Sequence, residues 1–205
     1  MKSFERDIPE GYSLSLYIDA RQKKFGIIFN CIALLVLALV AAIAIIPLAV
    51  GGKLDLLFEE SDPLVEIGGF VAFILLIILY TVLHELVHGA AYKLLTREKL
   101  TFGMSWSCAY CGVPHIYVYR GAALVAVCAP LVLLTLLFLP LTVWLYSVDA
   151  MLYMAAATFL GLHLGGCSGD AYVLLLLLFR FKGKKTLIRD TGPEQFFYTR
   201  ERADS

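Results

Sequence analysis

Four long stretches with few or no charged side chains constrain this chain more than any other feature of its sequence. They run from Phe25 to Val50, from Ile67 to about Leu95, from Gly121 to Tyr146 and from Met151 to Phe179. A helix that spans a bilayer needs about 20 apolar residues, and each stretch is long enough. Hydrophobic residues make up 60% of the 205 residues and charged residues 17%, an excess that one soluble core could not bury. We therefore expect an all-α membrane protein with four transmembrane helices.

The positions of the basic residues predict the orientation of these helices. Sixteen of the 17 Lys and Arg residues precede the first stretch, lie from the end of the second stretch (Lys93) to the start of the third, or follow the fourth, and only Lys53 lies in the opposite loops. Loops that stay in the cytoplasm are enriched in Lys and Arg. We therefore expect a multi-pass protein of the cell membrane, embedded in the lipid bilayer, with both termini in the cytoplasm. Acidic residues also number 17, so no excess of positive charge indicates a nucleic-acid partner.

Three segments are predicted to lie in the cytoplasm. Residues 1–24 form an N-terminal segment in which apolar and polar residues alternate over 12–18, a pattern typical of a strand. Residues 100–119 contain two β-rich runs, Leu100–Trp106 and Val113–Tyr119, that flank a turn region and predict a hairpin. These runs are equally compatible with interfacial loops whose aromatic side chains lie at headgroup depth. Residues 25–180 form the predicted four-span membrane domain, and residues 181–205 are predicted to form a basic tail after it.

The second stretch contains the sequence His84-Glu85-Leu86-Val87-His88. Histidines at positions i and i+4 lie on one face of a helix, so both imidazoles can reach one metal ion. Glu85 is placed where its carboxylate can reach a metal-bound water. Composition alone predicts about 0.003 occurrences of this pattern in the chain. A polar cluster that joins helices by hydrogen bonds is the alternative, but ionisable groups within a span are costly and usually functional.

A catalytic zinc ion usually takes three protein ligands and keeps a fourth position open. Asp170 is the one acidic residue after His88 that lies within a stretch. If the second and fourth stretches run in the same direction, Glu85 and Asp170 lie about 12 and 15 Å above the basic residues that follow them, at about 1.5 Å per residue. Asp170 is therefore the predicted third ligand, and the alternative is a buried carboxylate paired with another donor. Glycines at 165, 166 and 169 would let the fourth stretch approach the second closely.

Other residues with metal-binding side chains are weaker candidates. His163 lies seven residues before Asp170 on nearly the same face, so it is a possible second-shell donor or substrate contact. An interhelical hydrogen bond is the interpretation that we favour for this residue. Cys108, Cys111 and His115 have a spacing compatible with metal binding, but no fourth ligand lies nearby. We interpret these two cysteines as reduced, packed thiols.

Three parts of the sequence together carry a resemblance to a known family. They are the HELVH motif in a span, the stretch Tyr119–Pro130, and Ser168-Gly169-Asp170 in a later span. The chain resembles the Putative zincin peptidase family of bacterial membrane proteins over about residues 66–180, and it is more distantly similar to site-2 proteases. Site-2 proteases have Leu-Asp-Gly at the third ligand, whereas this chain has Gly169-Asp170-Ala171.

The resemblance implies that His84, His88 and Asp170 bind Zn2+ and that Glu85 acts as the catalytic base. The resulting hypothesis is a zinc metalloprotease of the HExxH type, an intramembrane endopeptidase that hydrolyses membrane-protein or peptide substrates near the cytoplasmic side. The alternative is a membrane protein that binds zinc for structure or metal sensing and does not cut. Glu85 favours the enzyme, because a closed structural site has no use for an acid beside an open coordination position.

Overall fold

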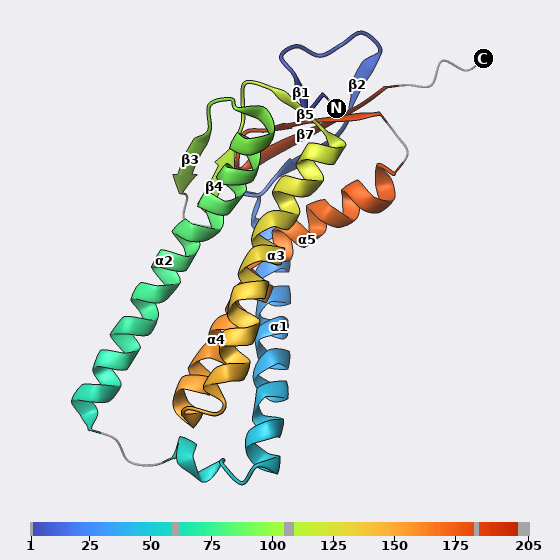
Figure 1. The fold of residues 1–205 in the computed structure, drawn as a ribbon. Coiled ribbons are helices and arrows are strands. Elements are labelled where there is room, and N and C mark those ends of the chain that lie inside the picture. Colours follow the sequence, from blue (N-terminus) through green and yellow to red (C-terminus); the bar gives the residue numbers. More distant parts are fainter. Residues whose placement is uncertain (1, 59–61, 105–108, 183–184, 201–205) are drawn as a thin grey trace. The chain divides into compact units, whose positions relative to one another are not determined.

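The computed structural model describes residues 2–58, 62–104, 109–182 and 185–200. In this part of the chain most residues are helical and a smaller share forms antiparallel strands (Figure 1). The chain divides into two compact units, one made of residues 1–27, 84–130 and 169–205 and the other of residues 28–83 and 131–168. Helices α2 (Pro63–Thr96) and α3 (Arg120–Leu145) each contribute one part to each unit.

The helices match the apolar stretches of the sequence. Three are long and apolar enough to cross a membrane: α1 (Lys23–Val50), α2 and α3. A fourth candidate is a broken pair, in which α4 (Ala150–Gly166) is followed by α5 (Ser168–Leu175) and a π-helical turn over Leu176–Arg180. Large apolar side chains remain exposed along these helices, as expected for surfaces that face lipid. Within the described residues, three helices could therefore span a membrane, or four if the broken pair is one span.

Five antiparallel strands from three distant parts of the chain form the larger sheet. Their order is β1 (Phe4–Glu5), β5 (Tyr117–Tyr119), β6 (Thr186–Asp190), β7 (Glu194–Arg200) and β2 (Tyr12–Asp19). Strand β2 includes the 12–18 segment in which the alternating pattern predicts a strand. Residues 181–205 do not form only a tail, because they contain β6 and β7. The turn between these two strands has Gly192 at a φ of 100°, where glycine avoids strain.

The smaller sheet corrects the predicted hairpin. Strand β3 (Thr101–Met104) pairs with β4 (Ala109–Gly112), so the second strand of the hairpin is not 113–119. Instead, β5 joins the larger sheet, where Val118 pairs with Phe4 on one side and Ile188 on the other. A β-rich composition favours a strand but does not specify its partner. The predicted first run also includes Trp106, which lies outside the described residues.

The unit that holds the sheets has its own hydrophobic core. Buried side chains of the sheet, including Ile188 and Phe197, belong to one cluster with Tyr92 of α2 and Ala126 of α3. Phe181 stacks on Phe197 with ring centroids 5.1 Å apart and planes 4° from parallel. Burial of such aromatic rings contributes strongly to packing. This core holds the last turns of α2 and the first turns of α3 against the sheet.

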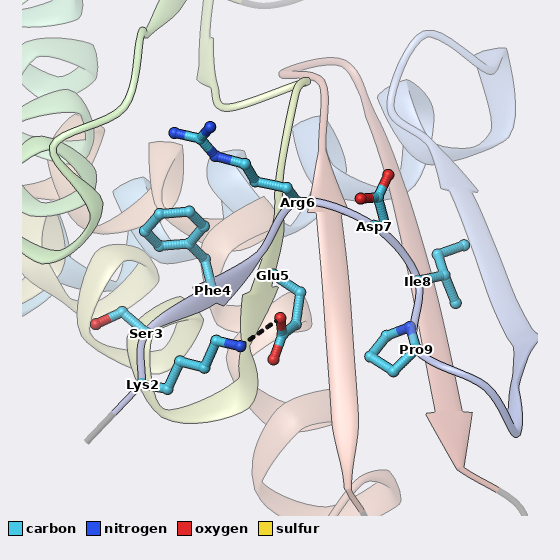
Figure 2. A pocket seen from close by; sticks show the side chains of 8 residues that line it. All are labelled: Lys2, Ser3, Phe4, Glu5, Arg6, Asp7, Ile8 and Pro9. Carbon is cyan, nitrogen blue, oxygen red and sulfur yellow. Dashed lines mark hydrogen bonds and ion pairs between the residues drawn. The ribbon is translucent and has the colours of Figure 1, made fainter.

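The N-terminal residues attach to one edge of the larger sheet. The Lys2 ammonium group lies 2.6 Å from the Glu5 carboxylate, and the Tyr119 hydroxyl donates to the same carboxylate at 2.6 Å. Figure 2 shows this ion pair among residues 2–9, which line an open surface pocket. The hydrogen bonds from Lys2 and Tyr119 lower the pKa of Glu5. These contacts connect β1 to β5 through side chains as well as backbone.

In the other unit, glycines of α4 allow close packing against α1. A Cβ atom added at Gly165 would lie 2.7 Å from the carbonyl oxygen of Ala33, and one at Gly161 would lie 2.9 Å from the side chain of Leu37. Small residues let two helix backbones approach in this way. The expectation that the glycines near 165 bring the fourth stretch against the second is therefore wrong for Gly165, because its near neighbours belong to α1.

Candidate metal centre

The buried face of α2 is confined to its last third. His84, His88, Tyr92 and Thr96 are all buried and recur every four residues, whereas the earlier part of the helix has no buried residue. Positions separated by four lie above one another on a helix. The whole HELVH motif is helical, so the two imidazoles project from one face as the spacing predicts. Their ring centroids are 5.0 Å apart.

Asp170 meets both imidazoles. Its Oδ2 atom lies 3.1 Å from Nε2 of His84, and its Oδ1 atom lies 3.3 Å from Nε2 of His88. One potential ligand atom from each of the three residues lies within 4.8 Å of the other two. Asp170 occupies the first turn of α5, where a negative charge interacts favourably with the helix dipole. The structure thus brings together the three side chains that the sequence predicts as ligands.

A backbone hydrogen bond fixes the orientation of the His88 ring. Its Nδ1 atom lies 2.9 Å from the carbonyl oxygen of Ala126 on α3. A carbonyl oxygen can only accept, so Nδ1 carries the hydrogen and Nε2 of the neutral ring presents a lone pair to Asp170. Histidine ligands of metals typically donate their second ring N–H to an oxygen in this way. The ring is therefore oriented for ligation through Nε2.

The donor set fits a zinc ion in both charge and spacing. A neutral imidazole nitrogen and a carboxylate oxygen are both acceptors, so their approach to 3.3 Å in the His88–Asp170 pair favours a proton or a metal cation between them. Two ligand atoms bound to tetrahedral zinc at about 2.0–2.1 Å lie about 3.3–3.4 Å apart. The observed separations of 3.1 and 3.3 Å are close to this value. Two imidazoles and a carboxylate that binds through one of its two oxygens would leave a fourth position for water.

Glu85 projects from the same part of α2 and is half-buried. Its carboxylate interacts electrostatically with His84, His88 and Asp170. No hydrogen bond ties Glu85 to these three residues among the bonds of the described chain. A carboxylate beside a metal site that does not itself ligate can act on a water in the open coordination position.

His163 lies in the other unit, where it joins helices. Its Nδ1 atom is 3.0 Å from the hydroxyl of Tyr80 on α2, and its Nε2 atom is 3.0 Å from the hydroxyl of Thr135 on α3. The residue is completely buried and its ring also contacts Phe138. These contacts are those expected of an interhelical hydrogen bonder, the interpretation that the sequence favours.

Of the sequence cluster Cys108, Cys111 and His115, the structure describes Cys111 and His115. Cys108 lies outside the described residues. Among the described ones, neither Cys111 nor His115 belongs to a group of three potential ligands. Cys111 is a buried free thiol, and burial raises its pKa to about 12. A Cβ atom added at Gly89 would lie 3.2 Å from its sulfur, so Cys111 packs against α2 next to His88.

Two buried polar residues near the centre are not singled out by the sequence. The Tyr92 hydroxyl donates to the Asp190 carboxylate at 2.7 Å. Burial raises the pKa of Asp190 to about 6. The sequence indicates a buried role for Tyr92 only through its position four residues after His88, on the same helix face. This spacing does not distinguish a polar contact from ordinary packing. The residues around Asp190 do not predict its contact with Tyr92, because the two residues are 98 positions apart in the sequence.

Comparison with models of known protein families places the candidate centre within a matched region. A family model described as Putative zincin peptidase matches residues 77–185, just over half of the chain. The matched region contains the HELVH motif and Asp170. No curated protein and no solved structure matches the chain.

Proposed function

This chain belongs to the Putative zincin peptidase family, and from that premise we propose that it is a zinc-dependent intramembrane endopeptidase. The observation that carries the proposal is the approach of His84 and His88 to opposite oxygens of Asp170, at 3.1 and 3.3 Å. These three residues would hold the metal. The proposed substrates are membrane proteins, cut near the cytoplasmic side.

The side chains divide the chemistry between them. Zinc, when bound, supplies a Lewis acid that polarises a carbonyl and makes a coordinated water more acidic. Glu85 takes a proton from the attacking water and later gives a proton to the leaving amine. His88 keeps its Nε2 lone pair directed at the centre because Nδ1 donates to Ala126. A helical substrate hides its amides in intrahelical hydrogen bonds, so the segment to be cut has to unwind first.

The strand order of the larger sheet supports the proposed topology. Strands β1 and β2 come from the N-terminal segment, β5 from the segment between α2 and α3, and β6 and β7 from the C-terminal segment. Strands that share backbone hydrogen bonds lie in the same compartment, so three segments on one side favour an even number of crossings between them. This parity agrees with four spans, in which α4 and α5 cross as one. The excess of basic residues in these segments favours the cytoplasm for that side.

Cleavage of a single-span reporter protein tests the proposal. We expect wild type to cut the reporter and Glu85→Gln to lose cleavage while retaining zinc, because Gln cannot accept the proton of water. The control is Glu66→Gln, which changes an exposed acid in the first turn of the same helix. A wild-type protein that binds zinc stoichiometrically but leaves every reporter intact would favour the zinc-binding alternative.

Metal content tests the ligand set separately from activity. Purified wild-type protein should contain about one zinc ion per chain, and His84→Ala and Asp170→Ala should contain much less. The matched control is His115→Ala, which removes an exposed histidine outside the candidate centre. Equal zinc content in wild type, His84→Ala and Asp170→Ala would refute the metal centre.

A further inference from the structure

Tyr92 and Asp190 form a buried polar pair that the proposed chemistry does not use. Their side chains are joined by a 2.7 Å hydrogen bond, and the residues are 2% and 5% exposed. Burial of a carboxylate is costly unless its oxygens are well bonded, so two apolar residues would fill the same space at lower cost. A directional bond at this position constrains geometry in a way that apolar packing does not.

Asp190 connects three elements of its unit. Its Oδ2 atom accepts from Tyr92 of α2, and its Oδ1 atom accepts from the backbone N–H of Gly192 in the β6–β7 turn at 2.9 Å. Its backbone carbonyl accepts from the N–H of Val113 at 2.8 Å, immediately after β4. A Cβ atom added at Gly112 of β4 would lie 2.4 Å from the backbone nitrogen of Gly192, so this junction is tightly packed.

The same junction touches the metal-binding turns of α2. Tyr92 lies one turn beyond His88, about 6 Å along the axis at about 1.5 Å per residue, on the same buried face. On the adjoining side, a Cβ atom at Gly89 would lie 2.7 Å from the Phe102 ring of β3. The larger sheet, through Asp190, and the smaller β3–β4 sheet, through Phe102, therefore contact α2 directly beside the turn that carries His88. Rotation of this helix would move both imidazoles relative to Asp170.

We propose that Tyr92 and Asp190 are positioning residues, whose hydrogen bond fixes the rotation and depth of the HELVH turns so that His84 and His88 face Asp170. The inference rests on the proposed metal centre. The bond acts through the helix and not through contact with the metal. It links the C-terminal strand β6 to the geometry of the centre, so a segment predicted from sequence to be a tail contributes to metal binding.

Titration of the purified full chain with Co2+ in detergent, followed by visible absorption, tests this role without a substrate. Tyr92→Phe keeps the ring and removes only the hydroxyl. We expect its Co2+ affinity to fall about 10-fold, the lower end of the range for residues that orient metal ligands, and its absorption band to shift. The control is Tyr119→Phe, which removes another tyrosine-to-carboxylate bond from the same unit but not from α2. Its affinity should match wild type.

Two variants of the acceptor complete the experiment. Asp190→Asn retains an oxygen that can accept from Tyr92, so its affinity should stay within about 3-fold of wild type. Asp190→Ala removes the acceptor and should lose affinity as Tyr92→Phe does, which also provides the measurement if Tyr92→Phe fails to fold. When Tyr92→Phe and Asp190→Ala are combined, the loss should be no larger than the greater single loss, because both variants remove the same Tyr92–Asp190 hydrogen bond.

The outcomes separate this inference from the proposed function. Wild type that binds Co2+ tightly, together with Tyr92→Phe or Asp190→Ala indistinguishable from Tyr119→Phe, would overturn the positioning role and leave the metal centre intact. Wild type that binds no Co2+ would overturn the metal centre and the positioning role together.

Discussion

Protonation of Asp190 should stabilise the folded sheet as the pH falls through the mildly acidic range. Burial raises the pKa of this carboxyl to about 6 from an ordinary value of 3.8, against the opposing effect of its hydrogen bond with Tyr92. The folded state thus favours the protonated form. The stabilisation from this group is fully present below about pH 3.8 and is lost as the pH rises through about 6.

The size of the effect follows from the two pKa values. The difference between about 6 and 3.8 corresponds to about 3 kcal/mol at about 1.4 kcal/mol per pKa unit. Slightly less than half of this, on the order of 1 kcal/mol, should appear between about pH 7.5 and pH 5. Asp19 acts in the opposite direction, because its hydrogen bond with Arg21 lowers its pKa. A variant that removes only the Asp190 titration is therefore needed to isolate the effect.

Hydrogen exchange of the β6–β7 region, corrected for the intrinsic effect of pH on exchange, measures this contribution. The free energy of opening in wild type, minus that in Asp190→Asn, should rise by on the order of 1 kcal/mol as the pH is lowered from about 7.5 to about 5. The subtraction cancels the pH-dependent contributions of titratable groups that both proteins share, including that of Asp19. A difference that stays constant over this range, or falls, would refute the assignment of a raised pKa to Asp190.

Three further predictions concern the candidate centre and its support. Glu85→Gln should lower the rate of reporter cleavage by about 10²–10⁴-fold with zinc content unchanged, as measured by cleavage kinetics and metal analysis. Zinc at about 100 times its Kd should stabilise wild type by about 2.7 kcal/mol in thermal unfolding, and Asp170→Asn should abolish most of this gain. Gly89→Ala should destabilise the protein by about 1–3 kcal/mol, since its Cβ would lie 2.7 Å from the Phe102 ring. Gly68→Ala on the same helix, where a Cβ meets nothing within 4 Å, should not destabilise it in the same assay.

The sequence by itself determined the features that repeat over short distances. Apolar runs of about 20 residues define the spans because a helix satisfies its backbone within itself. The spacing of His84 and His88 places both on one face by helix geometry alone. Asp170 was predictable because it is an acid at a similar depth in another span. Strand β2 was predictable from its alternation of apolar and polar residues.

Only the tertiary structure decided which distant segments meet. Tyr117–Tyr119 pairs with strands from both ends of the chain, and nothing in its own residues selects those partners over β3. The sequence predicts a tail for residues 186–200, because short strands next to basic residues have little local pattern that indicates a strand. In the structure these residues form β6 and β7 and include Asp190. The partners of Gly165 and Tyr92 likewise come from remote parts of the sequence. Helix faces are set within a few residues, whereas strand partners and buried polar pairs depend on contacts that form only when the whole chain has folded.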